Sequence, residues 1–291
     1  MDVGSVEFQC ADGYVLHGHC WKPDAADSAG MVVIAPATGV KAAYYHRYAA
    51  FLAAHGFTAV TFDYRGIGAS RPAGKLPDAR WYQWGLLDID AVLGWALERA
   101  GAGTVQVVGH SFGGFGTTLA ARSAHLSRML TVGAQHAFWP DYHPAHRGGY
   151  WWRWHAFMPV AAVLRGHFPG RRLGWLEDLP RGVALDWARS RRDFTRAGGP
   201  ADRAAMRAHL AAFTAPVLAI AATDDPYATR TAMARALAYC PNSASEIVQL
   251  DPAAYGLAEI GHFSLFHSRF EGTFWPDTLA WLVDGRNPWD R

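Results

Sequence analysis

The sequence predicts an α/β fold in which helices flank a mostly parallel sheet and one helical insertion interrupts it. Short apolar runs, typical of strands buried on both faces, alternate along the chain with segments of helical periodicity. This alternation stops near residue 138 and resumes near residue 214. Because structureless loops of that length are rare inside a domain, we interpret residues 138–213 as a helical cap between two core segments, 1–137 and 214–291.

The composition indicates a folded chain without a marked charge. The 291 residues carry a net charge of +2 and are 51% hydrophobic and 13% aromatic, which excludes disorder as the main state. The balance of 27 basic and 25 acidic residues predicts no binding to nucleic acid. No apolar run reaches the roughly 18 residues of a membrane span, and the first residues do not form a signal peptide. A cytoplasmic location is therefore expected.

The elements before the insertion follow from the apolar pattern. Val6–Cys10 and Tyr14–Gly18 alternate around a turn and predict a β-hairpin. Four buried strands are then predicted over Met31–Ala35, Phe57–Phe62, Val105–Val108 and Met129–Val132. Helical spacing covers Ala43–Ala54, Tyr82–Ala100 and the stretch from the turn after Val108 to about His125.

The alternation returns after the insertion. Strands are predicted over Pro216–Ala221 and Ile247–Leu250, with a helix over Thr229–Tyr239 between them. A final helix is predicted over Asp277–Val283. These segments extend the parallel sheet and cover it.

The turn after Val105–Val108 carries the pattern G-x-S-x-G, in Gly109-His110-Ser111-Phe112-Gly113. Its position between a strand and a helix is typical of a nucleophile elbow. Such a turn strains the serine backbone, raises the hydroxyl clear of the sheet and points the first amides of the helix at it. Ser111 is therefore the predicted nucleophile.

A serine nucleophile needs a base to take its proton and an acid to orient that base. The acid is expected at the carboxyl end of a later strand, and Asp224 and Asp225 both follow Pro216–Ala221. We favour Asp225 and interpret Asp224 as a cap of the loop or of the next helix. Asp141 is a third candidate.

The predicted base is His262, which follows Gly261 on the loop after the last strand. His267 competes for this role, but its neighbours are typical of a packed helix. His110 lies beside the nucleophile and is expected to shape the elbow. His136 either lines the substrate pocket or is a buried histidine of the core.

Acyl transfer also requires hydrogen-bond donors for the developing oxyanion. The backbone amide of Phe112, the residue after the nucleophile, is one predicted donor. The second is expected on the loop after Met31–Ala35, where small residues allow close approach. Ala37 is the preferred second donor and Thr38 the next choice.

These residues together resemble the α/β-hydrolase superfamily of serine hydrolases over essentially the whole chain. The resemblance rests on Pro36–Gly39, on the segment D-Y-R-G-x-G-x-S at Asp63–Ser70, on the elbow, and on Asp225 with Gly261-His262. We interpret Asp63–Ser70 as structural. Within the superfamily, the Ala-Thr-Gly-Val segment followed by Tyr-Tyr is similar to a poorly characterised bacterial group.

The resemblance implies an α/β-hydrolase fold, an acyl-enzyme on Ser111, and His262 and Asp225 as base and orienting acid. It implies neither a metal nor an organic cofactor. Serine at the elbow argues against dehalogenase and epoxide-hydrolase chemistry, in which this fold uses a carboxylate nucleophile. Many members have His-Gly after the first parallel strand, where this chain has Ala35–Thr38, so the second oxyanion donor departs from the family pattern.

The predicted cap has an unusual composition. Residues 139–212 hold six of the 13 Trp, and 12 Arg against six Asp or Glu. The tryptophans indicate either an aromatic lid over an apolar acyl pocket, with Trp151 and Trp154 as contacts, or packing inside a small lid with little core of its own. The arginines either favour an anionic substrate or, as we prefer, form a solvated face. An exposed aromatic patch for a membrane surface or partner subunit is the third interpretation.

The sequence thus predicts a serine hydrolase acting on a small-molecule acyl substrate, with a carboxylic ester preferred over a thioester or amide. The candidate substrate-binding residues are Thr38, His110, His136, Trp151 and Trp154. An acyltransferase would use the same acyl-enzyme, and a non-catalytic binding protein could share the fold. Self-association into a homo-oligomer stays open.

Overall fold

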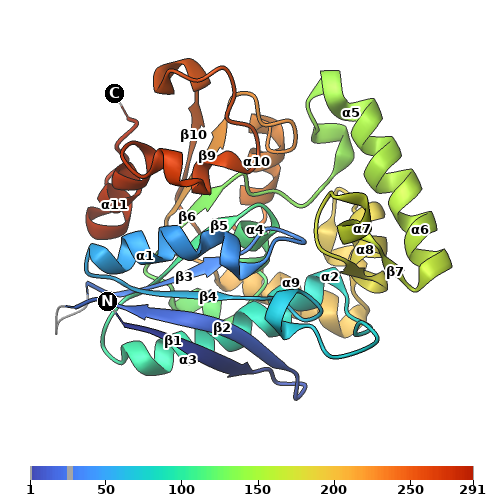
Figure 1. The fold of residues 1–291 in the computed structure, drawn as a ribbon, viewed down its shortest axis with the longest axis horizontal. Helices are drawn as coiled ribbons and strands as arrows, with labels where there is room; N and C mark the ends of the chain where they lie inside the picture. The colour runs from blue at the N-terminus through green and yellow to red at the C-terminus, as the bar shows by residue number, and fades with distance from the viewer. Residues whose placement is uncertain (1, 25–28, 291) are drawn as a thin grey trace.

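The computed structural model describes residues 2–24 and 29–290, and its centre is an eight-stranded sheet (Figure 1). In sheet order the strands are β1 (Asp2–Gln9), β2 (Val15–Lys22), β4 (Thr58–Phe62), β3 (Met31–Ala35), β5 (Val105–His110), β6 (Arg128–Val132), β9 (Val217–Ala222) and β10 (Ser245–Leu250). The hairpin β1–β2 joins β4 in antiparallel fashion, and the pairs from β4 to β10 are parallel. The predicted mostly parallel sheet is confirmed.

Helices cover both faces of this sheet. On one face, α1 (His46–Ala54) and α11 (Phe274–Asp284) pack Tyr48 and Trp275 into a core with Val32 and Ile34 of β3. On the other face lie α3 (Asp90–Ala100), α4 (Phe112–Thr117) and α10 (Arg230–Leu237), in a core that includes the alternate residues of β3. Burial on both faces explains why the strand sequences read as continuous apolar runs.

Two predicted helices are less regular than their sequences suggested. The one expected over Tyr82–Ala100 consists of α2 (Trp81–Gln83), a π-helical turn over Trp84–Ile89, and α3. The one expected to reach His125 is α4, which ends at Thr117 and is followed by a 3₁₀ turn over Ala121–His125. The hydroxyls of Thr117 and Thr118 donate to carbonyls of the preceding turn at 2.7 Å, an alternative that competes with regular helix.

The residues between β6 and β9 form short helices, most of which lie at one side of the molecule (Figure 1). In chain order these are α5 (Pro144–Tyr150), a π-helical turn (Trp151–Phe157), α6 (Met158–Arg165), α7 (Gly170–Leu173), α8 (Arg181–Ala188) and α9 (Pro200–Ala212). Two short strands, β7 (His167–Phe168) and β8 (Leu179–Pro180), precede and follow α7 and pair with each other in antiparallel fashion. Their apolar side chains belong to the same core as α3 and α4. The boundaries at 138 and 213 stay predictions.

The segment Asp63–Ser70 holds neighbouring loops in place through hydrogen bonds and an ion pair. The Asp63 carboxylate accepts the N–H groups of Ala42 and Ala69 at 2.7 and 2.8 Å. The Arg65 guanidinium pairs with buried Asp88, with 2.6 Å between Nε and Oδ1. These contacts agree with a structural role.

Among the described residues, no helix has the length and apolar character needed to cross a membrane.

Candidate active site

A cavity of about 730 Å³ lies where the carboxyl ends of the central strands meet residues 138–213, the segment called the cap below. Ser111 and His262 both line it, and so do Thr38 from the loop after β3 and Trp154 from the cap. Ligand sites in open α/β sheets form at this edge. Its volume is in the range of pockets for small organic ligands.

Ser111 occupies a strained turn between β5 and α4. Its backbone has φ 52° and ψ −122°, a conformation that non-glycine residues rarely adopt. The flanking glycines make the turn sterically feasible. A Cβ on Gly109 would come within 2.4 Å of Gly114 Cα, and one on Gly113 within 2.1 Å of the Ala35 carbonyl oxygen. This is the geometry that the G-x-S-x-G pattern predicts.

His262 and Asp225 form a buried pair, with 2.7 Å between Nδ1 and Oδ2. The other oxygen of Asp225 accepts the N–H groups of Tyr227 and Ala228 at 2.8 and 2.9 Å. Burial alone would raise the pKa of Asp225, but the His262 charge and these hydrogen bonds outweigh it and lower the pKa below its ordinary value. Asp225 is thus an ionised carboxylate that can orient the imidazole.

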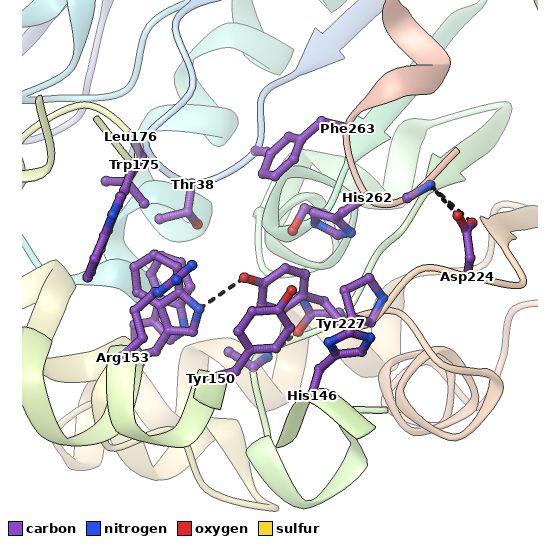
Figure 2. Close-up of a pocket in the computed structure, with 18 of the residues that line it drawn as sticks. Thr38, His146, Tyr150, Arg153, Trp175, Leu176, Asp224, Tyr227, His262 and Phe263 are labelled. Atoms are coloured by element: carbon purple, nitrogen blue, oxygen red, sulfur yellow. Dashed lines mark hydrogen bonds between the residues drawn. The ribbon is translucent and has the colours of Figure 1, made fainter. Parts of the chain in front are cut away.

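The competing acids have other partners. Asp224 accepts the N–H groups of Ile260 and Gly261 at 2.9 and 3.0 Å, so it caps the loop that carries His262 (Figure 2). Asp141 forms an ion pair with Arg235 and does not line the cavity. His267, the competing base, packs against the Tyr44 ring.

Ser111 and His262 both line the cavity. Within residues 2–24 and 29–290, Ser111 Oγ makes no hydrogen bond to the imidazole. Catalytic hydrogen bonds are often long before substrate binds, and they tighten in the complex. Gly133, which has φ +63°, lies against the His262–Asp225 pair. A Cβ added to Gly133 would be 2.9 Å from His262 Cε1.

The preferred second oxyanion donor has another partner. The Ala37 N–H donates to the buried Tyr45 hydroxyl at 3.0 Å, so the choice of Ala37 needs correction. The next amide, that of Thr38, has no acceptor in the described part of the chain. Phe112 begins α4, and its N–H therefore has no partner inside the helix. Of the three amides predicted from the sequence, those of Thr38 and Phe112 stay candidates for binding an oxyanion.

Tyr45 and His110 connect the Thr38 loop to the His262 loop. His110 Nε2 lies 2.9 Å from the His262 carbonyl oxygen, which can only accept, so Nε2 carries the proton. Burial lowers the pKa of His110 to about 3, which keeps the ring neutral and leaves Nδ1 to accept from Tyr45 at 2.7 Å. Every donor in this chain of hydrogen bonds meets an acceptor.

Three of the expected substrate contacts do not line the cavity. His110 is held behind it by the hydrogen bonds just described. His136 is buried among the rings of Phe115, Phe194 and Tyr239, so of its two interpretations the structure supports the core histidine. Trp151 is 41% exposed, because this helical segment turns its other side to the cavity. Thr38 and Trp154 do line the cavity.

Tyr227 joins the cap to the turn that holds Asp225, a role the sequence did not reveal. Its hydroxyl accepts the indole N–H of Trp154 at 3.0 Å, and its ring stacks on Tyr150 with 4.5 Å between centroids (Figure 2). The one feature of the sequence that could have pointed to Tyr227 is its position two residues after Asp225. Arg153 is a second lining residue that the sequence analysis did not single out.

In the described residues, no three His, Cys, Asp or Glu side chains are grouped so that they could hold a metal ion.

A strained serine between a parallel strand and a helix, with an acid and a histidine after later strands, defines an α/β hydrolase. The family model of the alpha/beta hydrolase fold matches residues 31–254, and the chain belongs to this family. No curated protein matches the sequence.

Solved structures share the fold at low sequence identity. A soluble variant of monoglyceride lipase from Saccharomyces cerevisiae, in complex with a substrate analog, is 15% identical, with a TM-score of 0.67 over 98% of this chain and 96% of that one. Est1E from Butyrivibrio proteoclasticus with bound ferulic acid is 14% identical, with a TM-score of 0.59 over 96% and 100%. The monoacylglycerol lipase of Paleococcus ferrophilus is 14% identical, with a TM-score of 0.58 over 98% and 100%.

Proposed function

We propose that the protein is a serine hydrolase that cleaves a carboxylic ester, or a related thioester or amide, through an acyl-enzyme on Ser111. The observation that carries the proposal is the convergence on one cavity of the strained Ser111 and of His262, whose Nδ1 lies 2.7 Å from the buried Asp225 carboxylate. The two lipases of similar fold support the same class of reaction.

In the proposed reaction Ser111 Oγ attacks the acyl carbonyl while His262 Nε2 takes its proton. Asp225 stabilises the imidazolium that forms. The Phe112 and Thr38 amides donate to the oxyanion. His262 then protonates the leaving alcohol, thiol or amine, and a water molecule, deprotonated by the same imidazole, releases the acid and regenerates Ser111.

Hydrolysis of a graded set of p-nitrophenyl esters, with a lactone and a thioester added, tests this function. We expect turnover of at least one member, and a loss of at least about 10³-fold in kcat for Ser111→Ala. Turnover that survives Ser111→Ala, or its absence with every substrate, would overturn the proposal. An acyltransferase would transfer the acyl group to an added alcohol in preference to water, which product analysis detects.

The cytoplasmic location and the self-association considered from the sequence stay predictions.

A further inference from the structure

Arg153 brings a positive charge to an otherwise largely aromatic part of the cavity. It lies on the π-helical turn of the cap and is half-buried. Among the lining residues that the structure describes, it is the one lysine or arginine. Figure 2 shows it beside Trp175, on the side of the cavity away from Asp224.

The Arg153 guanidinium rests on aromatic faces and has no anionic partner. Its central carbon lies 4.6 Å from the Trp175 ring centroid, 5.7 Å from that of Trp154 and 6.0 Å from that of Tyr150. In the described part of the chain it has no carboxylate within 4.0 Å and no hydrogen bond from its N–H groups. Arg171, also on the cap, differs because it pairs with Glu177 at 3.9 Å.

The carboxylates that face the cavity do not neutralise Arg153. Asp224 directs its oxygens to the amides of Ile260 and Gly261, and lies on the opposite side of His262 (Figure 2). Glu259 is exposed and belongs to the same loop as His262. A ligand anion would therefore be attracted to the cap side of the cavity and repelled from the His262 loop.

A guanidinium held against aromatic rings is well suited to bind a planar anion. The ring contacts restrict and partly desolvate the Arg153 guanidinium, while its N–H groups stay available for two parallel hydrogen bonds to a carboxylate. We infer that Arg153 binds a free carboxylate of the substrate, so that the substrate class is an ester with a second, ionised carboxyl group. This inference rests on the proposed ester hydrolysis and names its substrate.

Matched esters that differ only in the terminal group test the inference. The p-nitrophenyl monoester of adipic acid carries a carboxylate where p-nitrophenyl hexanoate carries a methyl group, and uncatalysed hydrolysis of each is subtracted. We expect wild type to prefer the monoester in kcat/KM. Arg153→Met, which keeps the length of the stem, is expected to lose about 10- to 100-fold on the monoester, mainly through KM, and little on the hexanoate.

Two further variants separate recognition from general charge. Arg153→Lys keeps the charge without the planar fork and is expected to fall between wild type and Arg153→Met. Arg165→Met removes an exposed charge at the end of α6, outside the cavity, and is expected to change neither substrate.

The outcomes distinguish this inference from the function on which it rests. Equal use of the two esters by wild type, or equal losses on both in Arg153→Met, would overturn the role of Arg153 and leave the hydrolase intact. If Arg165→Met loses as much kcat/KM on the monoester as Arg153→Met does, the net charge of the cap governs selection. That result would also overturn the role of Arg153. Failure of wild type to cleave either ester would overturn this inference, whereas the hydrolase itself is overturned only if the graded esters, the lactone and the thioester also stay uncleaved.

Discussion

Tyr45 does not line the cavity but is hydrogen-bonded to the Thr38 loop and, through His110, to the His262 loop. Its hydroxyl accepts the Ala37 N–H and donates to His110, which in turn donates to the His262 carbonyl. The position of the Thr38 amide therefore depends on a side chain that does not line the cavity. A buried polar chain of this kind is stable only when every member is satisfied.

Removing the Tyr45 hydroxyl is expected to lower kcat with little change in KM. Tyr45→Phe leaves the Ala37 N–H and His110 Nδ1 without their partner, at a cost of about 1–3 kcal/mol in unfolding free energy. Steady-state kinetics on a p-nitrophenyl ester and chemical unfolding measure the two effects.

Tyr48→Phe is the matched control for this prediction. Tyr48 lies on the same face of the sheet, is equally buried, and loses a 2.7 Å hydrogen bond to Thr278 far from the cavity. It is expected to lose stability but to keep its kcat. Equal falls in kcat for the two variants would contradict a positioning role for Tyr45.

Gly133 is expected to be essential because its missing side chain leaves room for the His262–Asp225 pair. An added methyl would lie 2.9 Å from His262 Cε1 and 3.1 Å from Asp225 Oδ2. We expect Gly133→Ala to reduce kcat by at least about 10²-fold, since a misplaced base loses the geometry that catalysis requires.

Gly166→Ala controls for backbone strain. Gly166 has φ +75°, and an added Cβ would meet nothing within 4 Å. Gly166→Ala should lower the free energy of unfolding about as much as Gly133→Ala does through its positive φ, without loss of activity. If both alanine variants keep full kcat, the contact between Gly133 and the pair has no functional weight.

The two adjacent carboxylates that follow strand β9 have separate tasks. Asp225 pairs with the His262 ring, and Asp224 ties down the loop that carries it. Asp225→Asn is expected to lower kcat by about 10³- to 10⁴-fold, because the amide cannot stabilise an imidazolium. Asp224→Asn keeps one acceptor for the loop amides and is expected to cost about 10-fold or less.

The comparison of these two variants, made at equal folded fraction, tests the assignment of the acid. A larger kcat loss for Asp224→Asn than for Asp225→Asn would reverse it. Near-ultraviolet circular dichroism of each variant checks that the fold persists.

Strands could be predicted from sequence more closely than helices, for a physical reason. Burial on both faces makes a parallel strand a continuous apolar run, and β3 (Met31–Ala35) was predicted with its observed ends. The helix after the elbow was predicted too long, since the glycines and threonines that end α4 were read as helical. The π-helical turns at Trp84–Ile89 and Trp151–Phe157 leave no periodic signal in a sequence.

In the candidate site, too, some residues could be predicted from the sequence and others could not. Ser111, Asp225 and His262 follow strands in a recognisable order, so local sequence was enough to propose them. The direction of the Ala37 amide was not predictable, because it depends on a tyrosine eight residues away that folds back onto it. Whether Trp151 or Arg153 faces the cavity depends on the register of an irregular helix, which composition does not encode.

At the scale of the whole molecule, buried neutral histidines make stability sensitive to acid. Burial lowers the pKa of His136 to about 4, whereas an unfolded histidine titrates near 6.5. The unfolded state therefore takes up the proton first as pH falls, and the contribution of His136 to stability is lost progressively from about pH 6.5 to about pH 4.

His136→Phe is expected to lose less stability on acidification than wild type. As pH falls from 7 to 4.5, the unfolding free energy of wild type should fall by roughly 2 kcal/mol more than that of His136→Phe, and urea unfolding at the two pH values measures this difference. His46 and His110, whose pKa values burial also lowers, are common to both proteins. An equal fall in both would contradict a neutral buried His136.

We propose that Ser111 is the activated nucleophile of this molecule, and labelling with a fluorophosphonate probe, followed by intact-protein and peptide mass spectrometry, measures this directly. We expect one adduct per folded chain, located on Ser111, absent from Ser111→Ala and strongly slowed in His262→Ala. An unlabelled folded protein, or an adduct that persists in Ser111→Ala, would contradict it.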